Sequence, residues 1–138
     1  MIIVDTNVIS YLLIPNEKYN QLAIKLYEKD KNWIAPSLWR YEFLSILTLY
    51  QRKTIIDPHI CKQLFKKALE IVESRDLINV DNVFNAIENS TLSAYDCNFV
   101  GLSNETGLPL LTEDKKILTQ FSTNAVSMEK YLVTIQHK

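Results

Sequence analysis

The sequence of 138 residues contains few cysteines and few glycines, and it has no long apolar run. Cys61 and Cys97 are too few for a disulfide framework and lack zinc-ligand spacing, which fits a reducing compartment. The only glycines, Gly101 and Gly107, exclude the glycine-rich loops that cradle nucleotide phosphates. No segment approaches the roughly 18 to 20 apolar residues that span a bilayer, and the opening MIIVDTN lacks signal-peptide features. We therefore expect a cytoplasmic protein.

The chain also lacks an excess of charge of either sign. It has 15 Lys and Arg against 16 Asp and Glu, a formal net charge of -1. A bound nucleic acid would therefore need a local basic patch or a bridging cation. Apolar residues make up 47% and charged residues 22%, which excludes a disordered chain. The length, without a linker, a repeat or a break in composition, predicts one domain over residues 1–138.

Short apolar runs alternate with longer segments of helical period. The predicted strands are Ile2–Val4, Trp33–Ala35, Leu77–Val80, Pro109–Leu111 and Ala125–Met128. One helix is expected directly after Asp5, and the others are Lys18–Asp30, Leu38–Arg52, His59–Ser74, Asn82–Ser90, Tyr95–Thr106 and Asp114–Phe121. This alternation predicts an α/β layer sandwich, a parallel sheet with helices on both faces.

Two carboxylates stand out by position. Glu42 falls roughly opposite the polar stripe of its helix, among Leu38, Ile46 and Leu49, where an unpaired anion would cost several kcal/mol if desolvated. A buried ion pair, protonation or a bound cation could each compensate for it. Asp5 ends the first strand, where the carboxyl ends of parallel strands line ligand crevices, although Asp before a helix also serves as an N-cap.

Two further acids also have structural explanations. Asp96 can form a capping box with Ser93, and Thr112 can cap a helix whose dipole Glu113 and Asp114 would complement. As a group, however, Asp5, Glu42 and Asp114 would converge at one end of the sheet.

Converging carboxylates repel one another. At about 4 Å and an effective dielectric near 20, each pair costs roughly 4 kcal/mol, so a divalent cation is expected among them. Oxygen ligands without nearby His or Cys indicate Mg²⁺ or Mn²⁺ rather than zinc. We expect His59, in a turn, and His137, near the end of the sequence, to be solvated.

The sequence resembles the PIN domain family, and within it the toxin ribonucleases of the VapC type. The resemblance spans essentially the whole chain. It is carried by Ile3-Val4-Asp5-Thr6-Asn7, Ala35-Pro36-Ser37-Leu38 leading to Tyr41-Glu42, Tyr95-Asp96, and Leu110-Leu111-Thr112-Glu113-Asp114 followed by Lys115.

The resemblance implies a three-layer α/β/α fold with about five parallel strands in the order 3-2-1-4-5. It implies hydrolysis of RNA phosphodiesters with Mg²⁺ or Mn²⁺, a cognate antitoxin and a homodimer. The metal-holding acids would be Asp5, Glu42, Asp96 and Asp114. We expect Asp5, Asp96 and Asp114 to bind metal directly and Glu42 to act through water or as a base. Asn7 and Thr112 match supporting positions, and Glu113 lies nearby without being counted.

Substrate contacts are less determined by the sequence. Lys115, Lys116 and Arg40 are candidate phosphate contacts, as are Arg52 and Lys53, although most surface cations are simply solvated. Tyr11, Trp39 and Tyr41 could stack on unpaired bases, but aromatic residues in such helices are more often core, and we favour core for Trp39.

Two other function classes remain open. One is a catalytically silent PIN module that binds RNA or a protein partner, against which the four intact acids argue. The other is an acidic-pocket protein such as a receiver domain, with Asp81 near the third strand, or an aspartate-nucleophile phosphatase. A receiver domain would have a pair of Asp residues after the first strand, and the phosphatase would have a second Asp two residues after the first. This sequence has Asp5-Thr6-Asn7 there instead.

Overall fold

The fold is built around a parallel sheet of five short strands. We describe it from a computed structural model, which covers residues 1–15 and 17–136; His137 lies outside the described residues. The strands are β1 (Ile2–Val4), β2 (Trp33–Ala35), β3 (Val72–Ser74), β4 (Leu110–Leu111) and β5 (Ala125–Val126). They pair in the order β3-β2-β1-β4-β5, and every pairing is parallel. The predicted order 3-2-1-4-5 is confirmed.

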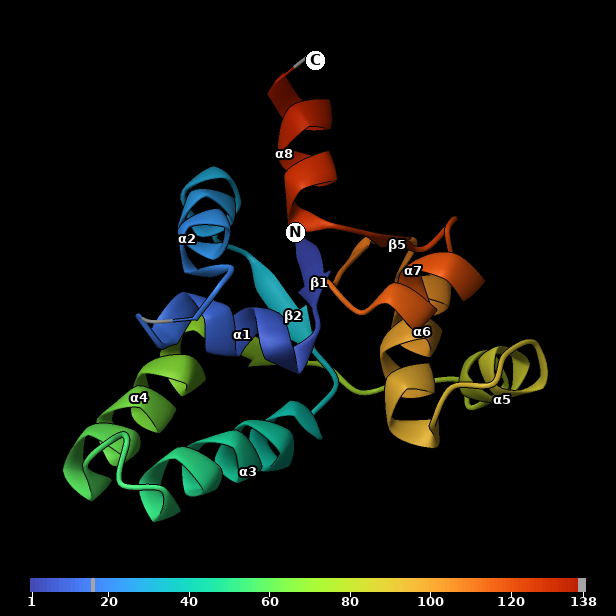
Figure 1. Cartoon of the computed structure of the whole chain (residues 1–138). Helices are drawn as coiled ribbons and strands as arrows, with labels where there is room; N and C mark the ends of the chain where they lie inside the picture. Colours follow the sequence, from blue (N-terminus) through green and yellow to red (C-terminus); the bar gives the residue numbers. More distant parts are fainter. Residues whose placement is uncertain (16, 137–138) are drawn as a thin grey trace.

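Helices cover both faces of the sheet (Figure 1). They are α1 (Thr6–Leu13), α2 (Asn20–Lys29), α3 (Trp39–Arg52), α4 (Pro58–Ile71), α5 (Asp81–Glu88), α6 (Ala94–Thr106), α7 (Lys115–Gln120) and α8 (Met128–Gln136). Helix α1 contacts α2, α3 and α4, while α5 packs on α6, which in turn contacts β1 and β4. Figure 1 shows these two groups on opposite sides of the central strands, and α8 packs against α2.

The local sequence explains where several elements begin and end. All three residues of β1 are fully buried, as expected for a central parallel strand covered by helices on both faces. Helix α4 begins at Pro58 because the Asp57 carboxylate accepts the N–H of His59 at 2.8 Å. Helix α6 ends at Gly107, whose φ of 74° lies in the left-handed region that glycine tolerates.

The third strand is not where the sequence analysis places it. The prediction of a strand at Leu77–Val80 is wrong, because this segment is a loop held by Glu105, whose carboxylate accepts the N–H groups of Ile78 and Asn79. The strand lies instead at Val72–Ser74, within the segment predicted as helical. The predicted strand at Ala125–Met128 ends at Val126, and Met128 begins α8, which the sequence analysis does not predict.

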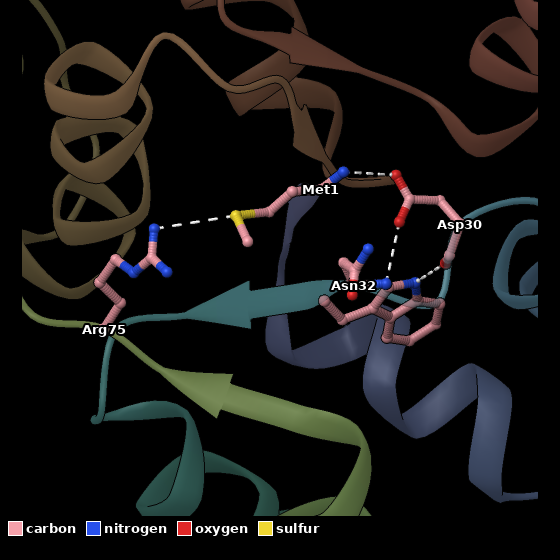
Figure 2. A network of polar contacts seen from close by, with 5 residues as sticks. Met1, Asp30, Asn32 and Arg75 are labelled. Atoms are coloured by element: carbon pink, nitrogen blue, oxygen red, sulfur yellow. Dashed lines mark hydrogen bonds and ion pairs between the residues drawn. The ribbon is translucent and has the colours of Figure 1, made fainter.

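At the amino ends of β1 and β2, Asp30 joins the two strands (Figure 2). Its carboxylate accepts the amine of Met1 at 2.8 Å and the N–H of Asn32 at 2.9 Å, and its carbonyl accepts Nε1 of Trp33 at 2.8 Å. The Arg75 guanidinium reaches the Met1 sulfur at 3.7 Å. These contacts fix the amino ends of the strands and do not involve the carboxyl ends.

None of the helices in the described part of the chain has the length and apolar character needed to cross a lipid bilayer.

Candidate active site

The carboxyl ends of β1 and β4 place Asp5 beside Thr112. Val4 pairs with Leu111, so the residues that follow these two strands are neighbours. Thr112 Oγ1 donates to Asp5 Oδ2 at 2.8 Å, and the two residues are 0% and 8% exposed. Asp5 occupies the N-cap position of α1, as the sequence allows, but the hydrogen bond that fixes its carboxylate comes from Thr112 and not from the first turn of the helix. The chain order reverses between β1 and β4, which is where open parallel sheets bind ligands.

Glu42 reaches the same region from the first turn of α3. Its Oε1 accepts a hydrogen bond from Thr6 Oγ1 at 2.7 Å, and Thr6 directly follows Asp5 in the chain. Glu42 is half-buried, and Leu49, expected on the same inward face, is 53% exposed. The buried face of α3 consists of Trp39, Phe43 and Leu47. Glu42 therefore lies at the border of the buried face and not within it.

Asp96 lies in the first turn of α6. Its N–H donates to Ser93 Oγ at 3.2 Å, so the predicted cap at Ser93 is confirmed. The cap is formed by the backbone of Asp96 and by the Ser93 hydroxyl. The carboxylate of Asp96 is half-buried and is not itself the group that caps α6.

Asp114 follows β4 and is itself the cap of α7. Its Oδ1 accepts the N–H groups of Lys116 at 2.9 Å and Ile117 at 3.1 Å, so the prediction that Thr112 caps this helix is wrong. The Thr112 hydroxyl instead accepts the N–H of Asp114 at 3.1 Å while donating to Asp5. One buried hydroxyl therefore connects the segments that carry two of the four acids.

The four carboxylates influence one another electrostatically. Burial raises the pKa of Asp5 from 3.8 to about 6; the hydrogen bond from Thr112 opposes this shift, and the charges of Asp96 and Glu42 add to it. Burial also raises the pKa of Glu42, against the hydrogen bond from Thr6 and with a contribution from Asp96. For Asp96, burial raises the pKa and the charge of Asp114 raises it further. Asp96 is therefore the acid whose charge interacts with each of the other three.

The chemistry of these acids suits a bound cation, but no three of their side chains are grouped as a complete metal site. The ion pairs found among the described residues involve other acids, so no Lys or Arg neutralises these four. Desolvated oxygen ligands without a protein counterion fit a hard divalent cation. Within residues 1–15 and 17–134, however, no three His, Cys, Asp or Glu side chains are spaced as a finished metal site. A cation bound here without movement of the carboxylates would be held by one or two of them and by water, as Mg²⁺ commonly is.

The remaining predicted residues differ in their placement. Asn7 is exposed in the first turn of α1. Lys115 and Lys116 are exposed in the first turn of α7, directly after Asp114. Glu113, named only as a neighbour, accepts the N–H of Met128 at 2.9 Å through Oε2.

The basic residues of α3 are spread along the helix. Arg40 is exposed near Asp76, whose pKa is lowered mainly by hydrogen bonds from Ser37 and to a lesser extent by Arg40. Arg52 ends α3, ten residues after Glu42, which at 1.5 Å per residue places it roughly 15 Å along the helix from the acid. The structure therefore does not bring Arg52 or its neighbour Lys53 to the carboxylates.

Two site features were not predicted from the sequence. Thr6 holds Glu42, although the sequence analysis treats Thr6 only as part of a motif. A hydroxyl directly beside Asp5 in the chain was the available signal. Tyr95 lines a pocket together with Tyr41 and Glu42, and its position directly before Asp96 was the signal there.

Of the three aromatic candidates, one is core. Trp39 is 0% exposed and packs near Phe43 and Phe65, which confirms the core interpretation. Tyr11 is partly buried against Tyr19. Of the three, only Tyr41 is mostly exposed, at 75%.

The profile of the PIN domain family matches residues 2–121. The chain belongs to the PIN domain family. The strand order of this PIN domain differs from the 2-1-3-4-5 order of receiver domains, and Asp81 lies in α5 and not at a strand end, so the receiver alternative is wrong.

Three solved structures are similar over nearly the whole chain. PAE2754 from Pyrobaculum aerophilum has a TM-score of 0.73 and 23% identity, covering 99% of this chain and 96% of that one. VapBC2 from Rickettsia felis, bound to a DNA fragment from its promoter, has a TM-score of 0.65 and 13% identity over 92% and 98%. VapC20 from Mycobacterium tuberculosis, a toxin that cleaves the sarcin-ricin loop, has a TM-score of 0.64 and 15% identity over 88% and 95%. At these identities the likeness shows a shared fold. No curated protein matches the sequence.

Proposed function

We propose that this PIN domain is a metal-dependent endoribonuclease and the toxin of a type II toxin-antitoxin pair. The observation that carries the proposal is the group of carboxylates without cationic partners at the β1–β4 switch point, where burial raises the pKa of Asp5, Glu42 and Asp96. The similarity in fold to VapC20, a toxin that cleaves the sarcin-ricin loop, supports RNA as the substrate.

Each acid has a proposed role. Asp5, Asp96 and Asp114 would hold Mg²⁺ or Mn²⁺, and Glu42 would act through water or as the base. When bound, the cation supplies a more acidic water and neutralises charge on the phosphate. Thr112 fixes one oxygen of Asp5, and Thr6 fixes one oxygen of Glu42. Glu42, with a pKa raised by burial, is suited to accept a proton from the attacking water. Cleavage would leave a 5′ phosphate and a 3′ hydroxyl.

Exposed cations near the acids would hold the RNA backbone. Lys115 and Lys116 directly follow Asp114, whereas Arg40, near the start of α3, lies near Asp76 and would contact RNA beyond the acids. With a net charge of -1, the chain depends on such local groups and on the bound cation to attract a polyanion. Asn7, exposed beside Asp5, would assist at the phosphate.

The decisive experiment measures cleavage of a labelled RNA by the purified protein. We expect cleavage with Mn²⁺ or Mg²⁺, loss of cleavage on adding EDTA, and a loss of roughly 100-fold or more in Asp96→Asn, because a lost ligand should cost at least as much as a lost supporting residue. Asp81→Asn, an exposed acid in the first turn of α5, is the matched control and should cleave normally. Full activity in EDTA together with full activity of Asp96→Asn would overturn the proposal.

The open spacing of the carboxylates favours a second candidate, a catalytically silent PIN domain that binds RNA or a protein. That candidate predicts binding without cleavage under saturating Mn²⁺. It also predicts that Asp96→Asn binds RNA as well as the unchanged protein does. The two candidates therefore differ in the cleavage assay.

We also propose partners for this chain. The VapBC2 complex, similar in fold, supports a cognate antitoxin, and a homodimer in the cytoplasm is part of the same proposal. Exposed apolar side chains on α3 and α4, including Leu44, Leu49 and Ile60, provide surface of the kind that protein partners cover. Sedimentation of the purified protein tests the dimer. Co-purification with the product of an adjacent gene that encodes a small DNA-binding protein tests the antitoxin.

A further inference from the structure

A pocket of about 400 Å³ opens beside Glu42. It is lined by Leu38, Tyr41, Glu42, Ser45 and Tyr95, which come from α3 and its N-cap position and from α6. We call it the tyrosine pocket. Tyr41 is 75% exposed and Tyr95 is 65% exposed, so both rings border an open space instead of filling the core.

The tyrosine pocket adjoins the carboxylates through the chain itself. Tyr41 directly precedes Glu42, and Tyr95 directly precedes Asp96, so each ring is carried on the same helical turn as one of the acids. Glu42 forms part of the pocket wall, and Asp96 acts electrostatically on Glu42. A ligand whose phosphate lies among the acids would therefore bring its neighbouring groups to this pocket.

The core does not require these two rings. On α3, Trp39 and Phe43 are fully buried and provide the aromatic packing against Phe65 of α4. Tyr41 contributes little to that packing, because three quarters of its surface is in contact with solvent. Large aromatic groups left exposed around a concave site are typical of a binding surface.

We propose that the tyrosine pocket binds an unpaired nucleobase next to the scissile phosphate. This inference rests on the proposed nuclease function. Aromatic rings bind bases of any identity by stacking, and the Ser45 hydroxyl can hydrogen-bond to a base edge. A paired base cannot enter, because both of its faces are covered in a duplex.

The size of the tyrosine pocket favours a base over a protein segment. Its volume is near the lower end for small-molecule sites, and its lining comes from two turns of α3 and one turn of α6. A partner helix would need a longer apolar groove to accommodate anchors over several turns. Glu42 in the wall also disfavours acidic peptides, whereas a neutral base carries no charge to be repelled.

The test measures binding of a labelled RNA of mixed sequence, single-stranded or as a duplex, by fluorescence anisotropy. Asp5→Asn is the background, so that the RNA is not cut during the measurement. Tyr41→Ala and Tyr95→Ala should each weaken single-strand binding by roughly 5-fold to 150-fold, the range for loss of one stacked base. Tyr41→Phe and Tyr95→Phe keep the ring and should bind within about twofold of the background. Duplex binding should change little in any variant.

Phe84→Ala is the matched control, because Phe84 is a 54% exposed aromatic residue on α5 that does not line the tyrosine pocket. Circular dichroism and thermal unfolding check that each variant folds. Equal single-strand binding by the alanine variants and the background would overturn the inference. So would an alanine variant that loses a purified protein partner while binding RNA normally, because the pocket would then belong to that partner.

The inference and the proposed function fail in different ways. If the unchanged protein cleaves RNA and the tyrosine variants bind and cleave as it does, the base-binding role of the pocket is wrong and the proposed nuclease function is retained. If the unchanged protein binds single-stranded RNA through the tyrosines but does not cleave it with Mn²⁺, the proposed nuclease function is wrong and the base-binding role of the pocket is retained. Absence of any RNA binding overturns both.

Discussion

Burial makes the negative charge of Asp5 unfavourable to the folded state. Its pKa is about 6 in the folded protein against 3.8 for an exposed carboxyl, so folding favours the protonated form. At about 1.4 kcal/mol per pKa unit, ionisation removes on the order of 3 kcal/mol of stability. That stability is fully present below about pH 4 and is lost as the pH rises to about 6. Glu42 and Asp96, whose pKa values are also raised, act in the same direction.

We therefore expect Asp5→Asn to stabilise the metal-free protein at pH 7. The amide is neutral and can still accept the hydrogen bond from Thr112, so the free energy of unfolding should rise by up to about 3 kcal/mol. At pH 4, where Asp5 is largely protonated, the two proteins should differ little. Urea unfolding in EDTA at both pH values measures this. A variant that is equally destabilised at pH 4 and pH 7 would show that the carboxylate charge is not the cause.

Thr112 fixes one carboxylate oxygen of Asp5. Its hydroxyl is fully buried, donates to Asp5 and accepts from the N–H of Asp114. Thr112→Val keeps the shape but leaves both partners unsatisfied, so we expect a loss of about 1–3 kcal/mol in the free energy of unfolding and slower RNA cleavage. Thr112→Ser keeps the hydroxyl and should retain most of the stability and the cleavage rate. Comparable losses in both variants would assign the effect to packing of the methyl group.

At the scale of elements, the sequence predicts strands well where both faces are buried. The run Ile2–Val4 is apolar throughout because helices cover both sides of β1, and it was predicted with its observed bounds. In β3 only Val72 is buried, while Glu73 and Ser74 are exposed at the edge of the sheet. An edge strand with one buried side chain has no apolar signature, so a nearby apolar loop segment was predicted in its place.

The packing of α5 on α6 depends on Gly101, which the sequence analysis used only to exclude phosphate loops. A Cβ at this position would stand 3.1 Å from both Cα and N of Val83 in α5, closer than ordinary contacts allow. Gly101→Ala gains roughly 1 kcal/mol in helix propensity but forces the α5 backbone outward at a cost of about 1–3 kcal/mol. We expect a net loss of up to about 2 kcal/mol in the free energy of unfolding, with faster amide exchange throughout α5.

Gly107→Ala is the comparison that separates packing from backbone strain. No described atom lies within 4 Å of a Cβ at Gly107, but its φ of 74° is strained for alanine. This variant should lose about 1–2 kcal/mol without a specific change in the amide exchange of α5. If both variants accelerate exchange in α5 equally, the close approach at Gly101 is not what positions that helix.

At the scale of the whole molecule, folding joins residues that the sequence keeps far apart. The sequence predicts the four acids as one group because each occurs in a short recognisable motif. It did not identify the hydrogen bonds that hold them, because Thr6 and Glu42 are 36 positions apart and Thr112 and Asp5 are 107 apart. The same limit applies to the tyrosine pocket, since Tyr41 on α3 and Tyr95 on α6 line one pocket only after the chain has folded.

If the four acids hold a divalent cation, the cation should stabilise the whole protein. Because a ligand that binds only the folded state stabilises it by mass action, Mn²⁺ at about 100 times its Kd should add roughly 2.7 kcal/mol and raise Tm on the order of 10 °C. Asp5→Asn, more stable than the unchanged protein without metal, should show little further increase. Glu88→Gln removes an exposed acid at the end of α5, away from the site, and should keep the full shift. An equal rise in Tm for all three proteins would mean that Mn²⁺ binds elsewhere, and no rise in any of them would mean that the carboxylates do not close around a cation.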